Sequence, residues 1–237
     1  MISINNTSTQ RIFEHVGVDL GYTDLEAVTT ESGRVYLTPS GKKYPSITTV
    51  LGHFGKHQIM EWRKAVGEEE ANKISARASS RGTALHTLCE RYIDNKPVFD
   101  EKTMPHVKAM FNSIKPVIDS RVGRVYVQEV PLYSDHLRLA GRVDLIAEFD
   151  GVVSVIDFKT SSRVKTSEDI KSYFEQESAY AIMFEERTNI PIVNLVTIMA
   201  VENDKNPLIF KEHRDNHAAD LVRKIRLYEK EKGIRYE

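Results

Sequence analysis

The middle of the chain is its most strand-like part. Residues 124–133, 137–149 and 152–158 are rich in β-branched, aromatic and other apolar residues. Turn-forming pairs stand between them, Ser134-Asp135 and Asp150-Gly151. Sequential strands that short turns connect pair antiparallel. These stretches therefore predict an antiparallel three-strand meander.

Helical spacing of apolar residues characterises most of the remaining chain. Helices are predicted over about residues 57–95, 104–120, 168–187 and 216–232. Pro116 is expected to end or kink the second of them, because proline removes a backbone donor from a helix. Thr166-x-x-Asp169 has the spacing of a capping box, which indicates the start of the third helix.

The order of these elements predicts an α/β protein. Residues 34–52 indicate two short strands around a turn at Pro39 to Gly41, with β-branched Ile47 to Val50 in the second. Another strand is predicted at 192–201, after the third helix. A meander followed by helix and strand gives a mixed central sheet flanked by helices. With neither an internal repeat nor a low-complexity linker, residues 1–237 are expected to form one domain.

Composition limits the classes of function. The formal net charge of -1 argues against a cationic coat for nucleic acid, so an anionic partner needs a local patch or a metal. The single cysteine, Cys89, excludes an internal disulfide framework and a four-cysteine cluster. Neither a membrane-spanning run of about 20 apolar residues nor a targeting signal is evident. We expect a cytoplasmic protein with no membrane partner.

The turn at Asp150-Gly151 sets the register of the two strands beside it. This pair is the preferred filling of a two-residue hairpin loop, so Phe149 is expected to face Val152. Counting outward along both strands then places Asp144 opposite Asp157. Because side chains alternate along a strand, Lys159 shares the face of Asp157. The sequence therefore predicts two carboxylates and an ammonium group at one point.

Like charges placed opposite each other destabilise a sheet, so the predicted pair needs a cause. A bound divalent cation, a shared proton, an error in the register and an ordinary solvated strand end all remain open. Two carboxylates with water suit Mg²⁺, and a nearby lysine would stabilise charge on a phosphate. Three further candidates are Glu129 in the preceding strand, the pair Gly82 and His86, and the pair Gln176 and Tyr180. Each pair has the four-residue spacing of one helix face, which an ordinary amphipathic helix surface also shows.

Taken in order, these residues resemble the motif series of a nuclease family. GTALH (82–86), Glu129, GRVDLI (141–146), IDFKTS (156–161) and QESAY (176–180) are similar to the RecB-like branch of the PD-(D/E)XK nucleases. YPSITTVLG and the segment before GTALH look most like the mitochondrial genome maintenance exonuclease and its bacterial and phage relatives. The resemblance covers about residues 44–202. Val143 stands where the family name has proline, and the lack of an N-terminal extension favours a bacterial or phage source.

The resemblance implies a restriction-endonuclease-like core and Mg²⁺- or Mn²⁺-dependent hydrolysis of DNA from the end of a single strand, in recombination, repair or phage genome processing. By position, the metal ligands would be His86, Asp144, Asp157 and the backbone carbonyl of Phe158. Lys159 would be the catalytic lysine, and Glu129 would act with it. The supporting or DNA-contacting residues would be Gly82, Thr160, Gln176 and Tyr180. An endonuclease of the same superfamily and an inactive DNA-binding or assembly protein are the alternatives.

Residues 1–120 are expected to form part of the DNA entrance, 121–202 the catalytic core and 203–237 a C-terminal helix. Cationic and aromatic side chains before GTALH are candidates for strand contact, because bases stack on aromatic rings. They are Lys56, Trp62, Arg63, Lys73, Arg77 and Arg81. The alternative is that Trp62 lies in the core and the charges form a solvated helix face.

Overall fold

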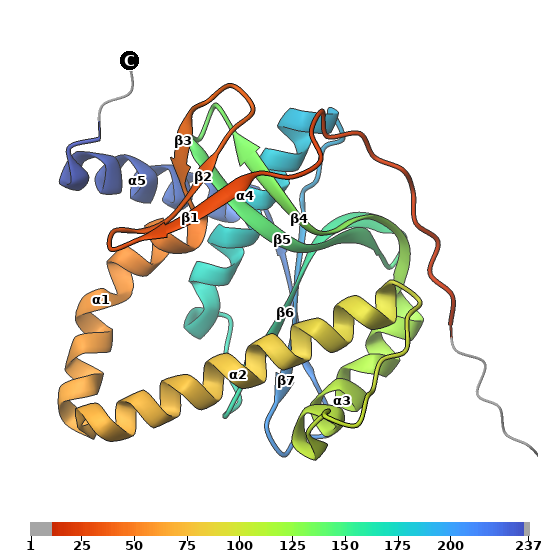
Figure 1. Ribbon diagram of the computed structural model, residues 1–237. Coiled ribbons are helices and arrows are strands. Elements are labelled where there is room, and N and C mark those ends of the chain that lie inside the picture. Colours follow the sequence, from red (N-terminus) through yellow and green to blue (C-terminus); the bar gives the residue numbers. More distant parts are fainter. Residues whose placement is uncertain (1–10, 235–237) are drawn as a thin grey trace, which may run out of the picture.

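A computed structural model describes residues 11–234 of the chain (Figure 1). A five-stranded mixed sheet has the order β4-β5-β6-β7-β8. Its strands are β4 (Val122–Ser134), β5 (Leu139–Phe149), β6 (Val152–Ser161), β7 (Asn194–Val201) and β8 (Leu208–His213). β4, β5 and β6 form the predicted antiparallel meander, whereas β7 runs parallel to β6 and β8 antiparallel to β7. The prediction of a mixed sheet is confirmed.

Helices cover both faces of this sheet. They are α1 (Ile47–Val66), α2 (Glu68–Ile93), α3 (Pro105–Arg121), α4 (Lys171–Thr188) and α5 (Asp215–Lys232), and a 3-10 turn, Glu168–Ile170, precedes α4. The apolar side chains of α2 and α3 form one core cluster with Ile156 and Phe158 of β6. Those of α4 and α5, with the first turn of α1, form another with Val155. Alternation along β6 therefore points Asp157 and Lys159 to the α4 face.

A second, three-stranded sheet precedes α1. It consists of β1 (Glu26–Thr30), β2 (Gly33–Leu37) and β3 (Lys43–Pro45), paired antiparallel in sequence order. The prediction that Ile47 to Val50 continue the last strand was wrong, because these residues begin α1. The Ser46 hydroxyl accepts a hydrogen bond from the Thr49 amide at 3.0 Å and caps that helix.

The long helix predicted over 57–95 is two helices. α1 ends at Val66, and Gly67, with φ of 90°, separates it from α2. In Figure 1, α1 and α2 form a V whose elbow points away from the sheet, while α2 continues across β6 and β7. From Lys56 to Ser80 nearly every side chain is exposed. This segment, the α1–α2 elbow, therefore owes its helical form to local interactions more than to packing.

Other predicted elements differ in their ends. α3 continues through Pro116 to Arg121, so that proline does not end the helix. Asp169 accepts a hydrogen bond from the Thr166 amide at 2.9 Å, which is one of the two bonds of a capping box. The Asp169 amide donates to the Thr166 carbonyl at 3.1 Å instead of to the hydroxyl. The segment expected to be a C-terminal helix also contains β8. Residues 1–10, where we looked for a targeting signal, and 235–237 lie outside the described part.

Candidate active site

The Asp150-Gly151 hairpin has the predicted register. Both residues have positive φ, 52° and 81°, and Phe149 pairs with Val152. Pairing continues to Leu145 and Ile156, and the ladder ends one step before Asp144 and Asp157. There the Asp144 carboxylate accepts a hydrogen bond from the Phe158 amide at 3.0 Å. The two acids thus lie at the point where β5 and β6 separate.

Asp157 is held by two neighbours. Its Oδ2 forms an ion pair with the Lys159 ammonium group, and its Oδ1 is 3.5 Å from Nε2 of Gln176. The same amide donates to the Tyr180 hydroxyl at 3.3 Å, so Gln176 links Tyr180 to Asp157. Burial and the nearby Asp144 raise the pKa of Asp157 to about 6, although Lys159 opposes this.

Lys159 is a stable cation in this setting. Burial alone would lower its pKa, but the carboxylates of Asp157 and Asp144 outweigh burial and raise it above the ordinary value. Its Nζ also lies 5.2 Å from the centroid of the Tyr173 ring. The lysine therefore presents fixed positive charge beside the acids.

A second group of ligand-type atoms lies on the α2 side of Asp144. One such atom from each of His86, Glu129 and Asp144 lies within 4.8 Å of the others. Nδ1 of His86 is 3.4 Å from Oδ2 of Asp144. Burial would lower the pKa of His86, but Asp144 and Asp157 raise it to about 9. Burial and Asp144 raise the pKa of Glu129 to about 7. Asp144 therefore belongs to both groups of acids.

The backbone is irregular where these groups meet. The neighbouring pairs Gln128–Leu145 and Val130–Val143 place Glu129 level with Asp144, and Glu129 has a left-handed φ of 50°. Leu145 packs with the α2–α3 cluster, whereas Val143, two residues earlier, packs with the α4–α5 cluster. The regular alternation of side chains therefore breaks at Asp144. A left-handed non-glycine residue costs free energy, and such strain is common at functional sites.

The donor set fits a divalent cation. Asp144 and Asp157 lie near the Lys159 ammonium group, and Glu129 and His86 lie on the other side of Asp144. Burial and the charge of Asp144 both penalise the ionised forms of Asp157 and Glu129, and a bound cation would offset that penalty. Carboxylate oxygens with one imidazole nitrogen suit Mg²⁺ or Mn²⁺. Phe158 points its amide at Asp144, and because both polar groups of a strand residue point to the same side, its carbonyl faces the same opening.

The predicted glycine lies beside β6. A Cβ atom on Gly82 would be 3.9 Å from Oγ1 of Thr160, an ordinary contact distance. Gly82 lines an open hollow of about 470 Å³ with Thr83, His86, Thr87, Glu90, Glu129, Arg142 and Asp144. Gly82 and His86 therefore both border the hollow that contains Glu129 and Asp144, as their shared helix face predicts.

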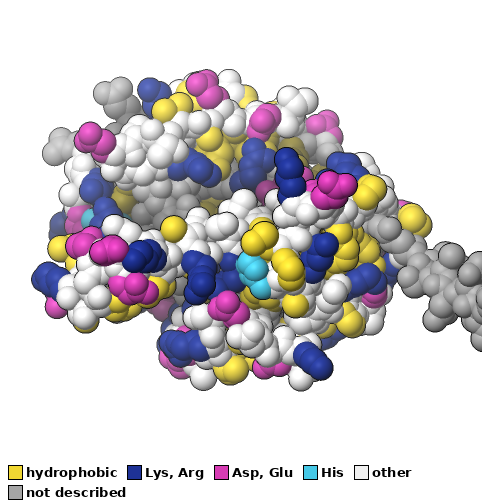
Figure 2. Space-filling model, turned by 60° about the horizontal axis from the view of Figure 1, so that its bottom comes forward, with side chains coloured by type: hydrophobic (Ala, Val, Ile, Leu, Met, Phe, Trp, Pro, Cys, Tyr) yellow, Lys and Arg dark blue, Asp and Glu magenta, His cyan; other side chains and the backbone are white. Residues whose placement is uncertain are grey.

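The predicted strand-contact residues lie along the α1–α2 elbow and α2. Lys73, Arg77 and Arg81 line a hollow of about 510 Å³ with Ser162, just beyond β6. Arg81 is buried and forms an ion pair with Glu202 at 3.0 Å. Figure 2 shows Lys and Arg side chains on either side of a hollowed region of this face.

The single tryptophan does not lie in the core. Trp62 is 36% exposed on the α1–α2 elbow, and Lys56 on the same helix is exposed as well. Arg63 forms an ion pair with Glu68 and hydrogen bonds with Asn72, which ties α1 to α2. Trp62 and Lys56 are thus open to a ligand, whereas Arg63 is engaged within the elbow.

Two residues of the site were missed by the sequence reasoning. Gly141 of β5 lies under Tyr180, because a Cβ atom there would be 2.8 Å from Cε1 of that ring. A glycine inside a strand is a sequence signal for such close approach. Glu177 is fully buried beside the predicted Gln176 and accepts a hydrogen bond from the Thr197 hydroxyl. The sequence around Glu177 gives no indication that this side chain is buried.

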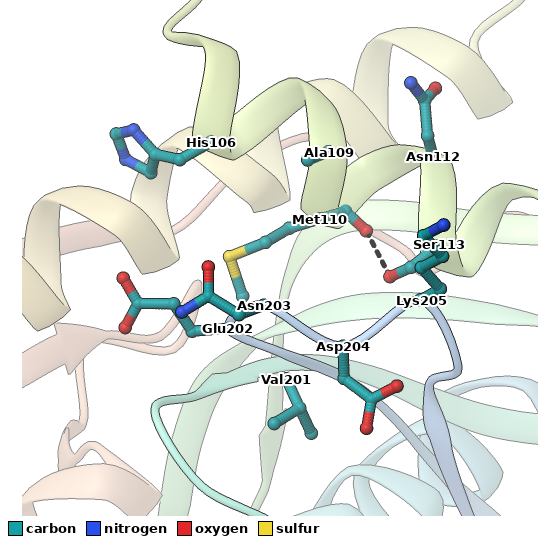
Figure 3. A pocket seen from close by; sticks show the side chains of 10 residues that line it. All are labelled: His106, Ala109, Met110, Asn112, Ser113, Val201, Glu202, Asn203, Asp204 and Lys205. Carbon is teal, nitrogen blue, oxygen red and sulfur yellow. Dashed lines mark hydrogen bonds between the residues drawn. The ribbon is translucent and has the colours of Figure 1, made fainter.

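Another hollow shares Glu202, the ion-pair partner of Arg81, with the hollow at Ser162 but none of its other lining residues. It has a volume of about 440 Å³ and lies between α3 and the turn from β7 to β8. The side chain of Met110 crosses its middle, and the Ser113 hydroxyl donates to the Met110 carbonyl (Figure 3). None of the predicted site residues lines it, so it provides a control region for the experiments below.

The sequence matches the family model of the PD-(D/E)XK nuclease superfamily over residues 57–227, and the chain belongs to that superfamily. The match spans every predicted site residue from Trp62 to Tyr180. A search of curated proteins found no match. Among the described residues 11–234, no helix has the length and apolar character needed to cross a membrane.

Proposed function

We propose that the protein is a Mg²⁺- or Mn²⁺-dependent exonuclease that hydrolyses single-stranded DNA from an end. The observation that carries the proposal is the position of Asp144, Asp157 and Lys159 where β5 and β6 separate, with His86 and Glu129 beside them. Superfamily membership supports phosphodiester hydrolysis. The finer assignment to the RecB-like branch, and to recombination, repair or phage genome processing, rests on the motif resemblance.

Each residue has a distinct task in this proposal. Asp144, Asp157, His86 and the Phe158 carbonyl would hold the cation, with Glu129 beside it. When bound, the cation supplies positive charge at the scissile phosphate and promotes ionisation of the attacking water. Lys159 stays protonated, so it cannot act as a base. Its ammonium group instead donates a hydrogen bond to the phosphate and stabilises the negative charge there. Gln176 keeps Asp157 in place through its amide.

The preference for single strands is supported by the α1–α2 elbow. Because the net charge of the chain is -1, binding of DNA has to come from local groups. Exposed Trp62 offers a ring on which an unpaired base can stack, and stacking contributes roughly 1–3 kcal/mol per base. Lys73 and Arg77 line a hollow that begins at the end of β6 and offer charge to the strand backbone.

The test uses single-stranded DNA labelled at its 5′ or 3′ end, with Mg²⁺, Mn²⁺ or EDTA. We expect metal-dependent loss of DNA, and Asp157→Ala and Lys159→Ala should each lower kcat by about 10²–10³-fold. Asp204→Ala, a carboxylate change in the hollow at α3, is the matched control and should keep the wild-type rate.

The fragments distinguish the modes of cleavage. Release of short labelled products from only one of the two ends indicates an exonuclease. Labelled fragments of intermediate length with either the 5′ or the 3′ label would indicate an endonuclease. Intact DNA in every lane, together with retained DNA binding, would replace the proposal with an inactive DNA-binding protein. Wild-type rates in Asp157→Ala or Lys159→Ala would show that the chemistry lies elsewhere.

A further inference from the structure

A hollow of about 420 Å³ lies beside the catalytic residues, between the beginning of α1, the first turns of α4, and α5. Gln176 lines it and contacts Asp157, at 3.5 Å between Nε2 and Oδ1. Tyr173 also lines it and lies under the Lys159 ammonium group. Two residues of its wall thus belong to the catalytic group as well.

We propose that this hollow binds one nucleotide of the substrate strand, next to the phosphate that is cleaved. The inference rests on the proposed function and adds a subsite to it. A volume of about 420 Å³ falls within the range of pockets that hold small ligands. A strand whose phosphate lies at Lys159 would place its neighbouring nucleotide on Tyr173 and Gln176.

The lining of the hollow suits a nucleotide. Phe54 and Tyr173 are half-buried aromatic residues that offer ring surface to a base. Lys159 and Lys165 both lie near the Tyr173 ring, with Nζ 5.2 and 5.4 Å from its centroid. Lys224 of α5 is already paired with Glu175, at 2.6 Å to both oxygens. Lys159 is paired too, with Asp157, whereas Lys165 donates to the Tyr173 hydroxyl at 3.4 Å, so the positive charge for a phosphate comes chiefly from Lys165.

Two glycines inside α1 give this hollow its depth. Gly52 and Gly55 are one turn apart and both line it. A Cβ atom on either would have no heavy atom within 4 Å, so the fold does not require glycine there. Glycine within a helix is less stable than alanine. Its presence at both positions is explained if larger side chains would occupy space that the nucleotide needs.

The experiment compares graded substitutions at these positions. Gly52→Ala and Gly55→Ala should each raise Tm by about 2–4 °C and keep most of the binding of the oligonucleotide dT10. Gly52→Leu and Gly55→Leu should weaken dT10 binding by about tenfold or more and raise KM, without lowering Tm. Mn²⁺ affinity, measured by calorimetry, should stay at the wild-type value.

Ala109→Leu is the control, because it adds three of the four side-chain carbons that Gly→Leu adds, to a helix beside the hollow at α3. It should leave dT10 binding and KM unchanged. A second explanation for glycine at positions 52 and 55 is that it lets α1 bend. In that case the alanine variants would lose activity as strongly as the leucine variants, and this result would overturn the subsite. Unchanged dT10 binding in the leucine variants would overturn it too.

Binding of dT10 is measured in EDTA, so it does not depend on cleavage. Failure of the proposed nuclease activity appears as intact DNA with Mg²⁺ and Mn²⁺ in the wild-type protein. Failure of the subsite appears as equal dT10 affinity in wild-type and leucine variants, or as no affinity in the wild type. The two results are therefore read from separate assays.

Discussion

Glu177 shows how one buried side chain responds to the charge of the site. Its carboxyl is fully buried on α4 and accepts one hydrogen bond, from Thr197. Burial and the charge of Asp157 raise the pKa of Glu177 well above its ordinary value. A neutral acid at this position avoids burying one more negative charge beside Asp144 and Asp157.

This protonation gives stability a pH dependence. Because the folded state binds the Glu177 proton more tightly than the unfolded state, the free energy of unfolding falls as pH rises above about 4.5. Glu177→Gln keeps the shape and does not titrate. Its stability relative to wild type should therefore increase from pH 5 to pH 8, by at most about 1.4 kcal/mol per pH unit.

Urea unfolding of both proteins at pH 5, 6.5 and 8 measures the difference. Glu185→Gln, a change at an accessible carboxylate of the same helix, is the control and should show a smaller pH-dependent difference from wild type. A stability difference between Glu177→Gln and wild type that stays constant over this range would mean that Glu177 carries no proton in the folded protein.

At the scale of elements, α4 lies so close to β5 that their contact sets the position of the Gln176–Tyr180 face. A Cβ atom on Gly141 would be 2.8 Å from the Tyr180 ring and 3.0 Å from Cγ2 of Ile47. Tyr180 is buried, so its ring has little room to move. Gly141 therefore controls where α4 holds Gln176 relative to Asp157.

Gly141→Ala should lower the free energy of unfolding by about 1–3 kcal/mol, because the added methyl group overpacks the core. It should also lower kcat, since a displaced Tyr180 shifts the amide that holds Asp157. Urea unfolding and single-strand cleavage provide the two measurements. Gly52→Ala, whose Cβ has free space, is the stability control. Wild-type stability in Gly141→Ala would contradict the close approach.

The sequence predicted some parts of this arrangement well, for local reasons. Asp150-Gly151 fixes the β5–β6 register because a two-residue turn leaves no freedom between the strands. The position of Glu129 was not predictable in the same way: the longer turn after Ser134 leaves the register of β4 open, and Glu129 itself has a left-handed backbone. Its place beside Asp144 depends on that tertiary irregularity.

The errors have physical causes as well. Ile47 to Val50 are β-branched and favour strands, yet the Ser46 cap and burial of Ile47 and Val50 on one helix face outweigh that preference. β8 was missed because LIFKEH is short, partly exposed and lies at the sheet edge, where its pattern resembles a loop. Long-range pairing with β7 makes it a strand.

At the scale of the whole molecule, the distribution of charge matters more than its sum. The chain has 33 basic and 34 acidic residues, so uniform attraction of DNA is not expected. Lys73 and Arg77 lie on α2 where it leaves the sheet, lining a hollow at the end of β6. The Lys73 ammonium group forms an ion pair with Glu69, at 2.7 Å between Nζ and Oε1. Binding of DNA in this part should therefore depend on few cationic groups.

The salt dependence of DNA binding measures how many cationic groups contact phosphates. Each phosphate contact on a single strand contributes about 0.7 to the slope of log K against log salt concentration. The double variant Lys73→Ala with Arg77→Ala should reduce the magnitude of that slope by up to about 1.4. Arg77 should account for the larger part, because Glu69 already neutralises some of the charge of Lys73.

Binding of labelled dT10 in EDTA at several KCl concentrations gives the slope. Lys230→Ala with Lys232→Ala removes the same charge from the last turn of α5 and should leave the slope unchanged. An equal reduction of the slope in the two double variants would mean that net charge, rather than the α2 hollow, governs binding. The wild-type slope in both would mean that Lys73 and Arg77 do not contact phosphates.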